Sequence, residues 1–220
     1  LWQLSRTLHT LEARVVHCHM RRANTSGRLA ALLAGVPVRI ATEHDMAIDK
    51  SWRHLQVDRL LARVTDCIVA VSRAVAEINA RRARISPDTF RVIYHGCTLD
   101  PARADLPSEE ARRQLGLPAA GPLVGYVGRL HAIKNVEAIV RAFAEPPLAD
   151  AHLVLVGDGA ERDRLTDLIR ALSLGARVHL LGFRTREDLP LVYAALDALV
   201  LASASEGFGL VLVEALAAGV

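Results

Sequence analysis

Cysteines are scarce in this 220-residue chain, and none of them forms a C-x-x-C pair. The isolated thiols of Cys18, Cys67 and Cys97 argue against a disulfide framework, and we expect them to be reduced and buried in a cytoplasmic protein. Long apolar runs are absent as well, because charges interrupt each stretch before it reaches the roughly 20 residues that a membrane-spanning helix needs.

Aromatic residues make up only 4% of the chain, and the formal net charge is a modest +3. Single-stranded nucleic acids are usually bound by aromatic side chains on a strongly basic surface, so this class of function is disfavoured. Lysine is rarer still. Lys50 and Lys134 are the only lysines in a chain that otherwise takes arginine for its positive charge.

The familiar nucleotide-binding glycine motifs are also missing. Gly157 and Gly159 follow a predicted strand, but Arg162 occupies the third glycine position of G-x-G-x-x-G, and no Walker A sequence occurs. A nicotinamide-dependent dehydrogenase is therefore disfavoured. We interpret Gly157–Gly159 as a tight turn that lines a cleft.

What the chain does contain is a regular alternation of strands and helices, which predicts an α/β fold with parallel sheets. Strands are predicted at residues 15–19, 38–42, 66–71, 90–94, 123–127, 152–156, 177–181 and 198–201. Helices are predicted at residues 25–34, 53–64, 73–83 and 135–143, the last with Asn135 as its cap. Thr185–Asp188 reads as a capping box that starts a further helix.

The periodicity fades after residue 98 and returns at residue 121, which predicts two domains joined by a linker. We assign residues 1–103 to the first domain, 104–120 to the linker, with a short polar helix that ends near Leu115, and 121–220 to the second domain.

Two carboxylates lie eight residues apart in the segment from Ser205 to Ala215. Glu206 lies in a glycine-rich turn, and Glu214 lies about one turn into the apolar helix that is predicted to begin near Leu210. The backbone amides of such a turn can approach an anion, and the carboxylates can accept hydrogen bonds from paired sugar hydroxyls. The alternative is an ordinary helix start with acidic residues near it.

A second candidate site follows the strand at residues 123–127. The loop from Gly128 to Lys134 carries Arg129 and Lys134 and opens a helix, where a diphosphate would be stabilised by both cations. Because lysine is rare in this chain, Lys134 indicates that the function of the loop favours a compact point charge over an arginine side chain.

Together these two motifs, Gly128-Arg129-(x4)-Lys134 and Glu206-(x7)-Glu214, resemble the retaining nucleotide-sugar glycosyltransferases of family four, the "group 1" type, which have the GT-B fold. The resemblance extends from Val15 to Val220. Further segments that are similar to those of the family lie at residues 66–72, 91–96, 153–159 and 178–183.

The resemblance implies two Rossmann-like domains, a nucleoside diphosphate sugar as donor, and transfer of its sugar to an acceptor hydroxyl of a glycan, a lipid-linked compound or a small molecule. Arg129 and Lys134 would neutralise the leaving diphosphate, and Glu206 would bind the transferred sugar. Glu214 would bind the ribose. No cofactor and no metal are implied. Further donor contacts are expected from Gly207, Phe208, Gly209 and Leu210.

Histidines gather at the ends of the first two predicted strands. The resemblance places His44 near the reaction centre and His19 on the acceptor side, whereas we expect His17 to be a core or capping residue. His17, Cys18, His19, Glu43, His44 and Asp45 could instead bind a metal ion. Against a metal, no D-x-D pair occurs, and we expect His17 and His19 to point to opposite faces of their strand.

Two domains of this type need roughly 300 residues or more, so we expect the 220-residue chain to be a fragment, incomplete at both ends and inactive alone. Two alternative functions stay open: a nucleotide-sugar epimerase of the same fold, and a non-catalytic module that binds a sugar nucleotide or a membrane. Binding to a membrane would depend on the basic, amphipathic helix predicted at residues 53–64. The same helix would allow the enzyme itself to contact the inner membrane face peripherally.

Overall fold

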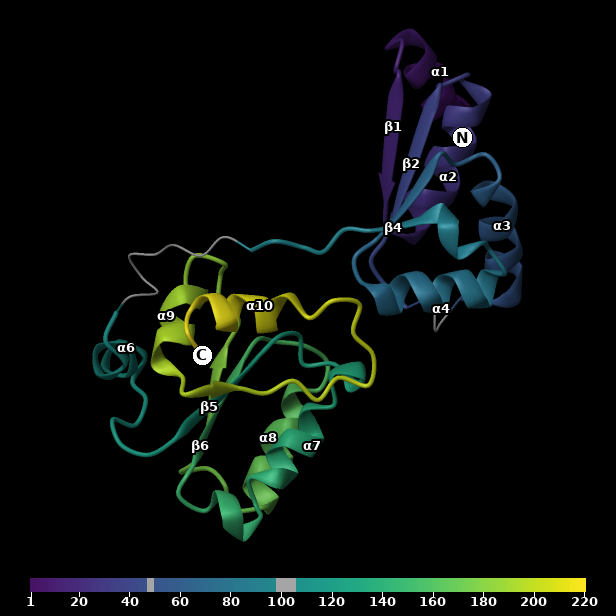
Figure 1. Ribbon diagram of the computed structural model, residues 1–220. Coiled ribbons are helices and arrows are strands. Elements are labelled where there is room, and N and C mark those ends of the chain that lie inside the picture. The colour runs from purple at the N-terminus through teal and green to yellow at the C-terminus, as the bar shows by residue number, and fades with distance from the viewer. Residues whose placement is uncertain (47–49, 98–105) are drawn as a thin grey trace. The chain divides into compact units, whose positions relative to one another are not determined.

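The computed structural model describes residues 1–46, 50–97 and 106–220. Within these ranges the chain divides into two compact units. The first comprises Leu1–His95 with Glu206–Phe208, and the second comprises Gly96–Ser205 with Gly209–Val220. Each unit contains a four-stranded parallel sheet with helices packed against it (Figure 1). The predicted α/β fold class is confirmed.

The first unit has the strand order β1-β2-β3-β4. Its strands are β1 (Val15–His19), β2 (Val38–Glu43), β3 (Cys67–Ala70) and β4 (Phe90–Val92). Its helices are α1 (Trp2–Thr10), α2 (Arg21–Leu33), α3 (Trp52–Ala62) and α4 (Arg73–Ala83), followed by the 3₁₀ turn η1 (Pro87–Thr89). The predicted strands and helices of this unit are confirmed to within a few residues, whereas α1 has no counterpart among the predictions.

Local sequence explains how α4 is placed between β3 and β4. The hydroxyl of Ser72 accepts a hydrogen bond from the amide of Val75 at 3.2 Å, which caps the helix start. Arg84 ends the helix in the left-handed conformation at φ 54°. Between these ends, Val75 is fully buried and packs with Ile68 in the core of the unit.

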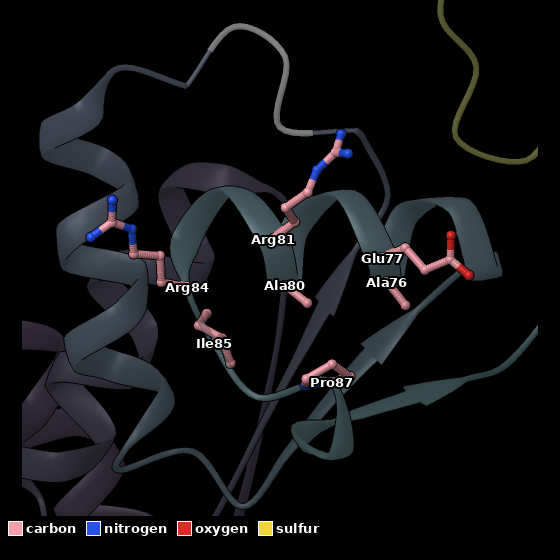
Figure 2. Close-up of a pocket in the computed structure, with 7 residues that line it drawn as sticks. All are labelled: Ala76, Glu77, Ala80, Arg81, Arg84, Ile85 and Pro87. Carbon is pink, nitrogen blue, oxygen red and sulfur yellow. The ribbon is translucent and has the colours of Figure 1, made fainter.

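A surface pocket of about 420 Å³ lies beside α4 (Figure 2). It is lined by apolar and charged side chains of α4 and of the segment that follows it, namely Ala76, Glu77, Ala80, Arg81, Arg84, Ile85 and Pro87. None of the site residues predicted from the sequence lines this pocket.

The second unit has the strand order β7-β6-β5-β8. Its strands are β5 (Leu123–Val127), β6 (His152–Val156), β7 (Val178–Gly182) and β8 (Ala198–Leu199). Its helices are α6 (Ser108–Leu115), α7 (Val136–Ala142), α8 (Arg162–Ala171), α9 (Leu189–Ala195) and α10 (Leu210–Ala217), with 3₁₀ turns η2 (Ala132–Lys134) and η3 (Pro146–Leu148). The strands match the predictions closely, except that β8 ends two residues earlier.

The short polar helix predicted before the second domain is α6, and a buried arginine holds it to the second unit. Arg112 is 6% exposed. It donates to the carbonyl of Ala195 at 3.0 Å and to the carboxylate of Asp197 at 2.7 Å, and the same carboxylate accepts from the amide of Leu123 at 2.6 Å. The domain and linker boundaries stay predictions. Residues 98–105, which end the predicted first domain and begin the predicted linker, lie outside the described residues.

Asn135 is the N-cap residue of α7, as predicted, but its backbone is left-handed, with φ 51°, and its side chain makes no capping hydrogen bond. The predicted capping box at residues 185–188 differs from the structure. The carboxylate of Asp188 does accept from the amide and hydroxyl of Thr185, at 3.1 and 2.7 Å. Because α9 begins only at Leu189, this pair closes the turn that precedes the helix and is not a capping box within its first turn.

Candidate functional site

The loop that carries Arg129 and Lys134 follows β5 directly. Arg129 has an exposed side chain, and its carbonyl accepts a hydrogen bond from the hydroxyl of buried Tyr126 at 2.8 Å. Lys134 is half-buried at the end of η2. The side chain of His131 accepts from the amide of Ile133 at 3.3 Å and so caps this turn. Both cations are therefore presented by a loop with defined internal hydrogen bonds.

The glycine turn after β6 packs directly on this cationic loop. A Cβ atom at Gly157 would lie 1.9 Å from the carbonyl oxygen of Gly128, and one at Gly159 would lie 2.3 Å from that of Leu130. The carbonyl of Asp158 also accepts from the amide of Leu130 at 2.9 Å. The two glycines are thus required for close packing of two loops, which explains a G-x-G pattern that lacks the dinucleotide-binding spacing.

The segment that leads to the acidic motif also meets the cationic loop. The amide of Ala204 donates to the carbonyl of Ile133 at 2.8 Å, and both residues belong to the second unit. Ile133 adjoins Lys134, and Ala204 stands two residues before Glu206. The structure therefore joins, through one backbone hydrogen bond, two segments that the sequence separates by about 70 residues.

Glu214 lies on α10, whose N-cap Gly209 is left-handed at φ 77°. The Glu214 side chain belongs to the core-facing side of the helix, and the residue is 6% exposed. One carboxylate oxygen, Oε2, accepts from the hydroxyl of fully buried Tyr193 at 2.7 Å. Burial, and then the adjacent Glu214, raise the pKa of Tyr193, so the phenol stays a donor.

Sequence reasoning missed Tyr193. The signal that could have found it is a single polar tip in the otherwise apolar run Leu189–Ala195, because a buried tyrosine hydroxyl usually needs a partner.

The remaining donor-site residues divide between the units. Glu206, Gly207 and Phe208 cluster with the first unit, whereas Gly209, Leu210 and Glu214 belong to the second. The binding of one ligand by both glutamates therefore stays a prediction.

In the first unit, four histidines form a contiguous array at the carboxyl ends of the strands. The rings of His17 and His19 have centroids 4.2 Å apart, and Nδ1 of His19 lies 3.1 Å from Nε2 of His44. His44 in turn stacks on His95, with centroids 5.4 Å apart. Nε2 of His17 is hydrogen-bonded to the hydroxyl of Thr42 at 2.7 Å.

The expectation that His17 and His19 point to opposite faces is wrong. Side chains two residues apart on a strand lie on the same face, which is why their rings meet. His19 is in register with Thr42, so His44, two residues further on, follows on the neighbouring strand at the same edge. His95, which sequence reasoning did not single out, completes the array.

A buried polar network supports the strand end that carries His44. Lys50 donates to Glu43 at 3.0 Å and to Asp58 at 2.8 Å, and Arg28 donates to the other oxygen of Asp58 at 3.3 Å. Asn24 donates to the carbonyl of Thr42 at 2.9 Å. Lys50 is only 6% exposed, so one of the two lysines is a structural cation and Lys134 is the candidate for chemistry.

Burial and the neighbouring ionisable groups change the pKa of His44. Burial, followed by the neighbouring His19 and His95, lowers the pKa of His44, while Asp45 and Glu43 oppose this shift. His44 is therefore favoured as a neutral imidazole near pH 7.

Among the described residues, no group of three or more histidine, cysteine or carboxylate side chains is placed to hold a metal ion. Nor does the described part of the chain contain a helix long and apolar enough to cross a membrane.

Comparison with known proteins assigns the class. Residues 107–220 match the family model "Glycosyl transferases group 1", and residues 1–101 match "Glycosyltransferase Family 4". The chain belongs to this family of glycosyltransferases and has its GT-B type of fold, with two parallel α/β sheets.

Individual relatives differ in the substrates for which they are named. The chain is 34% identical to a D-inositol 3-phosphate glycosyltransferase of Salinispora tropica, across 93% of this chain and 48% of the relative. It is 29% identical to an Escherichia coli UDP-Gal:alpha-D-GlcNAc-diphosphoundecaprenol alpha-1,3-galactosyltransferase, across 93% of this chain and 56% of the relative. The chain thus spans about half the length of these curated relatives.

Among solved structures, the chain is similar to HepE of Anabaena in complex with UDP-glucose. The TM-score is 0.82 and the identity 29%, and the match covers 99% of this chain and 60% of HepE. The strand-helix alternation and the two charged motifs thus identified the family correctly.

Proposed function

We propose that the protein transfers a hexose from a uridine diphosphate sugar to an acceptor hydroxyl, with retention of configuration at the anomeric carbon. The observation that carries this proposal is the backbone hydrogen bond between Ile133 and Ala204, because it draws the cationic loop and the segment before Glu206 together within one unit. The similarity to HepE, solved with UDP-glucose, supports the choice of donor.

Most of the proposed donor contacts come from the second unit, and Glu206 and Gly207 are counted with the first. Glu214, held through Oε2 by Tyr193, would accept hydrogen bonds from the ribose hydroxyls with its other carboxylate oxygen. Arg129 and Lys134 would contact the diphosphate. Backbone amides between Gly207 and Leu210 would bind the phosphates or the sugar, and Glu206 would accept from hydroxyls of the transferred hexose.

The chemical step breaks the bond between the anomeric carbon and the diphosphate oxygen. Negative charge then grows on the leaving diphosphate, and Arg129 and Lys134 stabilise it more strongly in the transition state than in the ground state. No divalent ion is needed in this scheme. His44 would hydrogen-bond the sugar or acceptor at the reaction centre, with His19 on the acceptor side. With retention, a donor phosphate oxygen takes the acceptor proton on the face from which it leaves.

The family match does not define the acceptor, and the relatives named above act on different ones. We test the proposal by incubating the complete protein with radiolabelled UDP-glucose or UDP-galactose and a panel of polyol phosphates and lipid-linked sugars. A labelled glycoside with stoichiometric UDP supports transfer. An isomerised donor without glycoside would support the epimerase instead, and a donor that binds and is recovered unchanged with every acceptor would contradict the transferase proposal.

We further propose a cytoplasmic protein that touches an anionic membrane surface through α3. Trp52 and Leu60 on this helix are 69% and 59% exposed, and Arg53 and Arg63 are exposed as well. The only acidic residue of α3, Asp58, turns inward to Lys50 and Arg28. Co-sedimentation with phosphatidylglycerol vesicles should fall at high salt and in the double variant Trp52→Ala/Arg53→Ala. Equal recovery on neutral vesicles would exclude this contact.

A further inference from the structure

The contact between His19 and His44 restricts which protons the two rings can carry. Nδ1 of His19 and Nε2 of His44 are 3.1 Å apart, a distance at which one nitrogen must donate and the other accept. A neutral pair satisfies this bond, and so does a pair that carries one extra proton. Two extra protons would place two N–H groups and two positive charges against each other.

Neighbouring groups act on this pair from each adjoining strand end. From β1, His17 lies against His19 and is itself anchored to Thr42. After β4, His95 stacks on His44. From β2 and the loop after it, Glu43 and Asp45 favour a proton on His44, whereas burial and the other imidazoles disfavour it. Glu43 is itself neutralised by Lys50.

The contact also decides which atom of His44 can meet a substrate. Nε2 of His44 is engaged by His19, and within the described ranges Nδ1 makes no hydrogen bond. A ring held at one nitrogen and stacked on its face by His95 has little freedom to rotate. The other nitrogen, Nδ1, therefore has a defined direction, and in the neutral ring it carries a proton only if Nε2 accepts the hydrogen bond from His19.

We propose that His19 is a positioning residue, which acts through its hydrogen bond to Nε2 of His44 and presents Nδ1 of His44 to the reacting sugar or acceptor. The role of Nδ1 rests on the proposed transferase function. The coupling between the two imidazoles does not depend on the proposed function, because it follows from their contact alone.

The coupling is measured by NMR on the protein labelled with ¹⁵N-histidine, whose nine histidines are assigned by single replacements. We expect the neutral rings to hold complementary tautomers, with a proton on only one of the two facing nitrogens. The nitrogen shifts of the neutral form should show one dominant tautomer of His44. A proton on both facing nitrogens or on neither, or an even mixture of His44 tautomers, would overturn the proposal.

Two variants test the hydrogen bond between the rings. His19→Asn keeps a polar group near the position of Nδ1, so His44 should retain its dominant tautomer. His19→Leu should lose this preference for one tautomer. His54→Asn, at an exposed position of α3 outside the array, is the matched control and should leave the His44 tautomer unchanged. A His44 tautomer that is unaffected in His19→Leu would contradict positioning by His19.

Kinetics then test the link to catalysis. In His19→Leu we expect kcat to fall by about tenfold or more with the donor KM within about twofold, and His19→Asn to restore most of kcat, because the lost interaction matters for the reacting groups rather than for donor affinity. Equal loss in both variants would refute a positioning role. If the unaltered protein transfers no sugar, the proposed function fails, and the NMR result still decides whether His19 holds His44.

Discussion

Removing the hydroxyl of Tyr193 should destabilise the second unit without changing its shape. Tyr193→Phe keeps the buried ring but leaves Oε2 of Glu214 without its donor at 2.7 Å. Hydrogen bonds to charged groups contribute about 1.5–3 kcal/mol, and both residues are more than nine-tenths buried, so solvent cannot replace the lost donor. At about 2–4 °C per kcal/mol for a chain of this size, the expected fall in Tm is about 3–12 °C.

The assay has to detect the unfolding of the second unit, which contains Tyr193 and Glu214. Both tryptophans of the chain, Trp2 and Trp52, lie in the first unit, so their fluorescence would miss the change. Differential scanning calorimetry reports both units. Tyr94→Phe is the matched control, because Tyr94 is 55% exposed in the first unit and its loss should stay within about 0.5 kcal/mol.

A double-mutant cycle isolates the pair. Glu214→Met removes the carboxylate but keeps an unbranched side chain, and the combination with Tyr193→Phe should cost less than the sum of the single changes by about 1–3 kcal/mol. Additive effects, or a Tyr193→Phe protein that is as stable as the unaltered one, would refute the reasoning that Tyr193 holds Glu214.

The remaining predictions concern charge and pH. Lys134→Ala should lower kcat by roughly 10²-fold or more, the scale of one preorganised electrostatic contact, whereas Arg170→Ala, at an exposed position of α8, should not; steady-state kinetics with the labelled donor decide this. Glu214→Gln should mainly raise the donor KM, and Glu206→Gln should lower kcat too; unchanged donor kinetics in both would remove them from the site. Activity should survive exhaustive EDTA treatment, and strict recovery on adding Mg²⁺, Mn²⁺ or Zn²⁺ would revive the metal alternative. Burial and neighbouring histidines lower the pKa values of His17 and His44, so the unfolded chain binds more protons, and Tm should fall as the pH drops from 7.5 to 5.5. A Tm that rises over this range would contradict the assigned shifts.

The sequence predicted most of the fold because buried parallel strands are short, apolar and bounded by turn residues, as at Leu123–Val127 and His152–Val156. It also predicted the family, because the charges at Lys134 and Glu214 stand at fixed distances from glycine-rich turns. These signals are local, and a single sequence carries them well.

What the sequence did not predict depends on partners far along the chain. Tyr193 meets Glu214 across 21 residues, and His95 joins the array from a third strand end, so no local signal identifies the partner of either residue. Asn135 was predicted as a cap from residue type and does occupy the N-cap position of α7, but its backbone is left-handed and its side chain makes no capping hydrogen bond, which the residue type does not reveal. The opposite-face prediction for His17 and His19 failed for another reason, a miscount of strand periodicity.

Because Lys50 is buried, a reagent that modifies lysine amines should react with only one of the two lysines of this chain. Its amine lies between the carboxylates of Glu43 and Asp58, with 4% of the side chain exposed, and is closed to reagents in the folded protein. Lys134 is the only other lysine. Among residues 1–220, and apart from the N-terminal amine, amine-selective labelling therefore reports on the cationic loop. The extent to which a nucleoside diphosphate sugar protects Lys134 from the reagent measures occupancy of the proposed donor site.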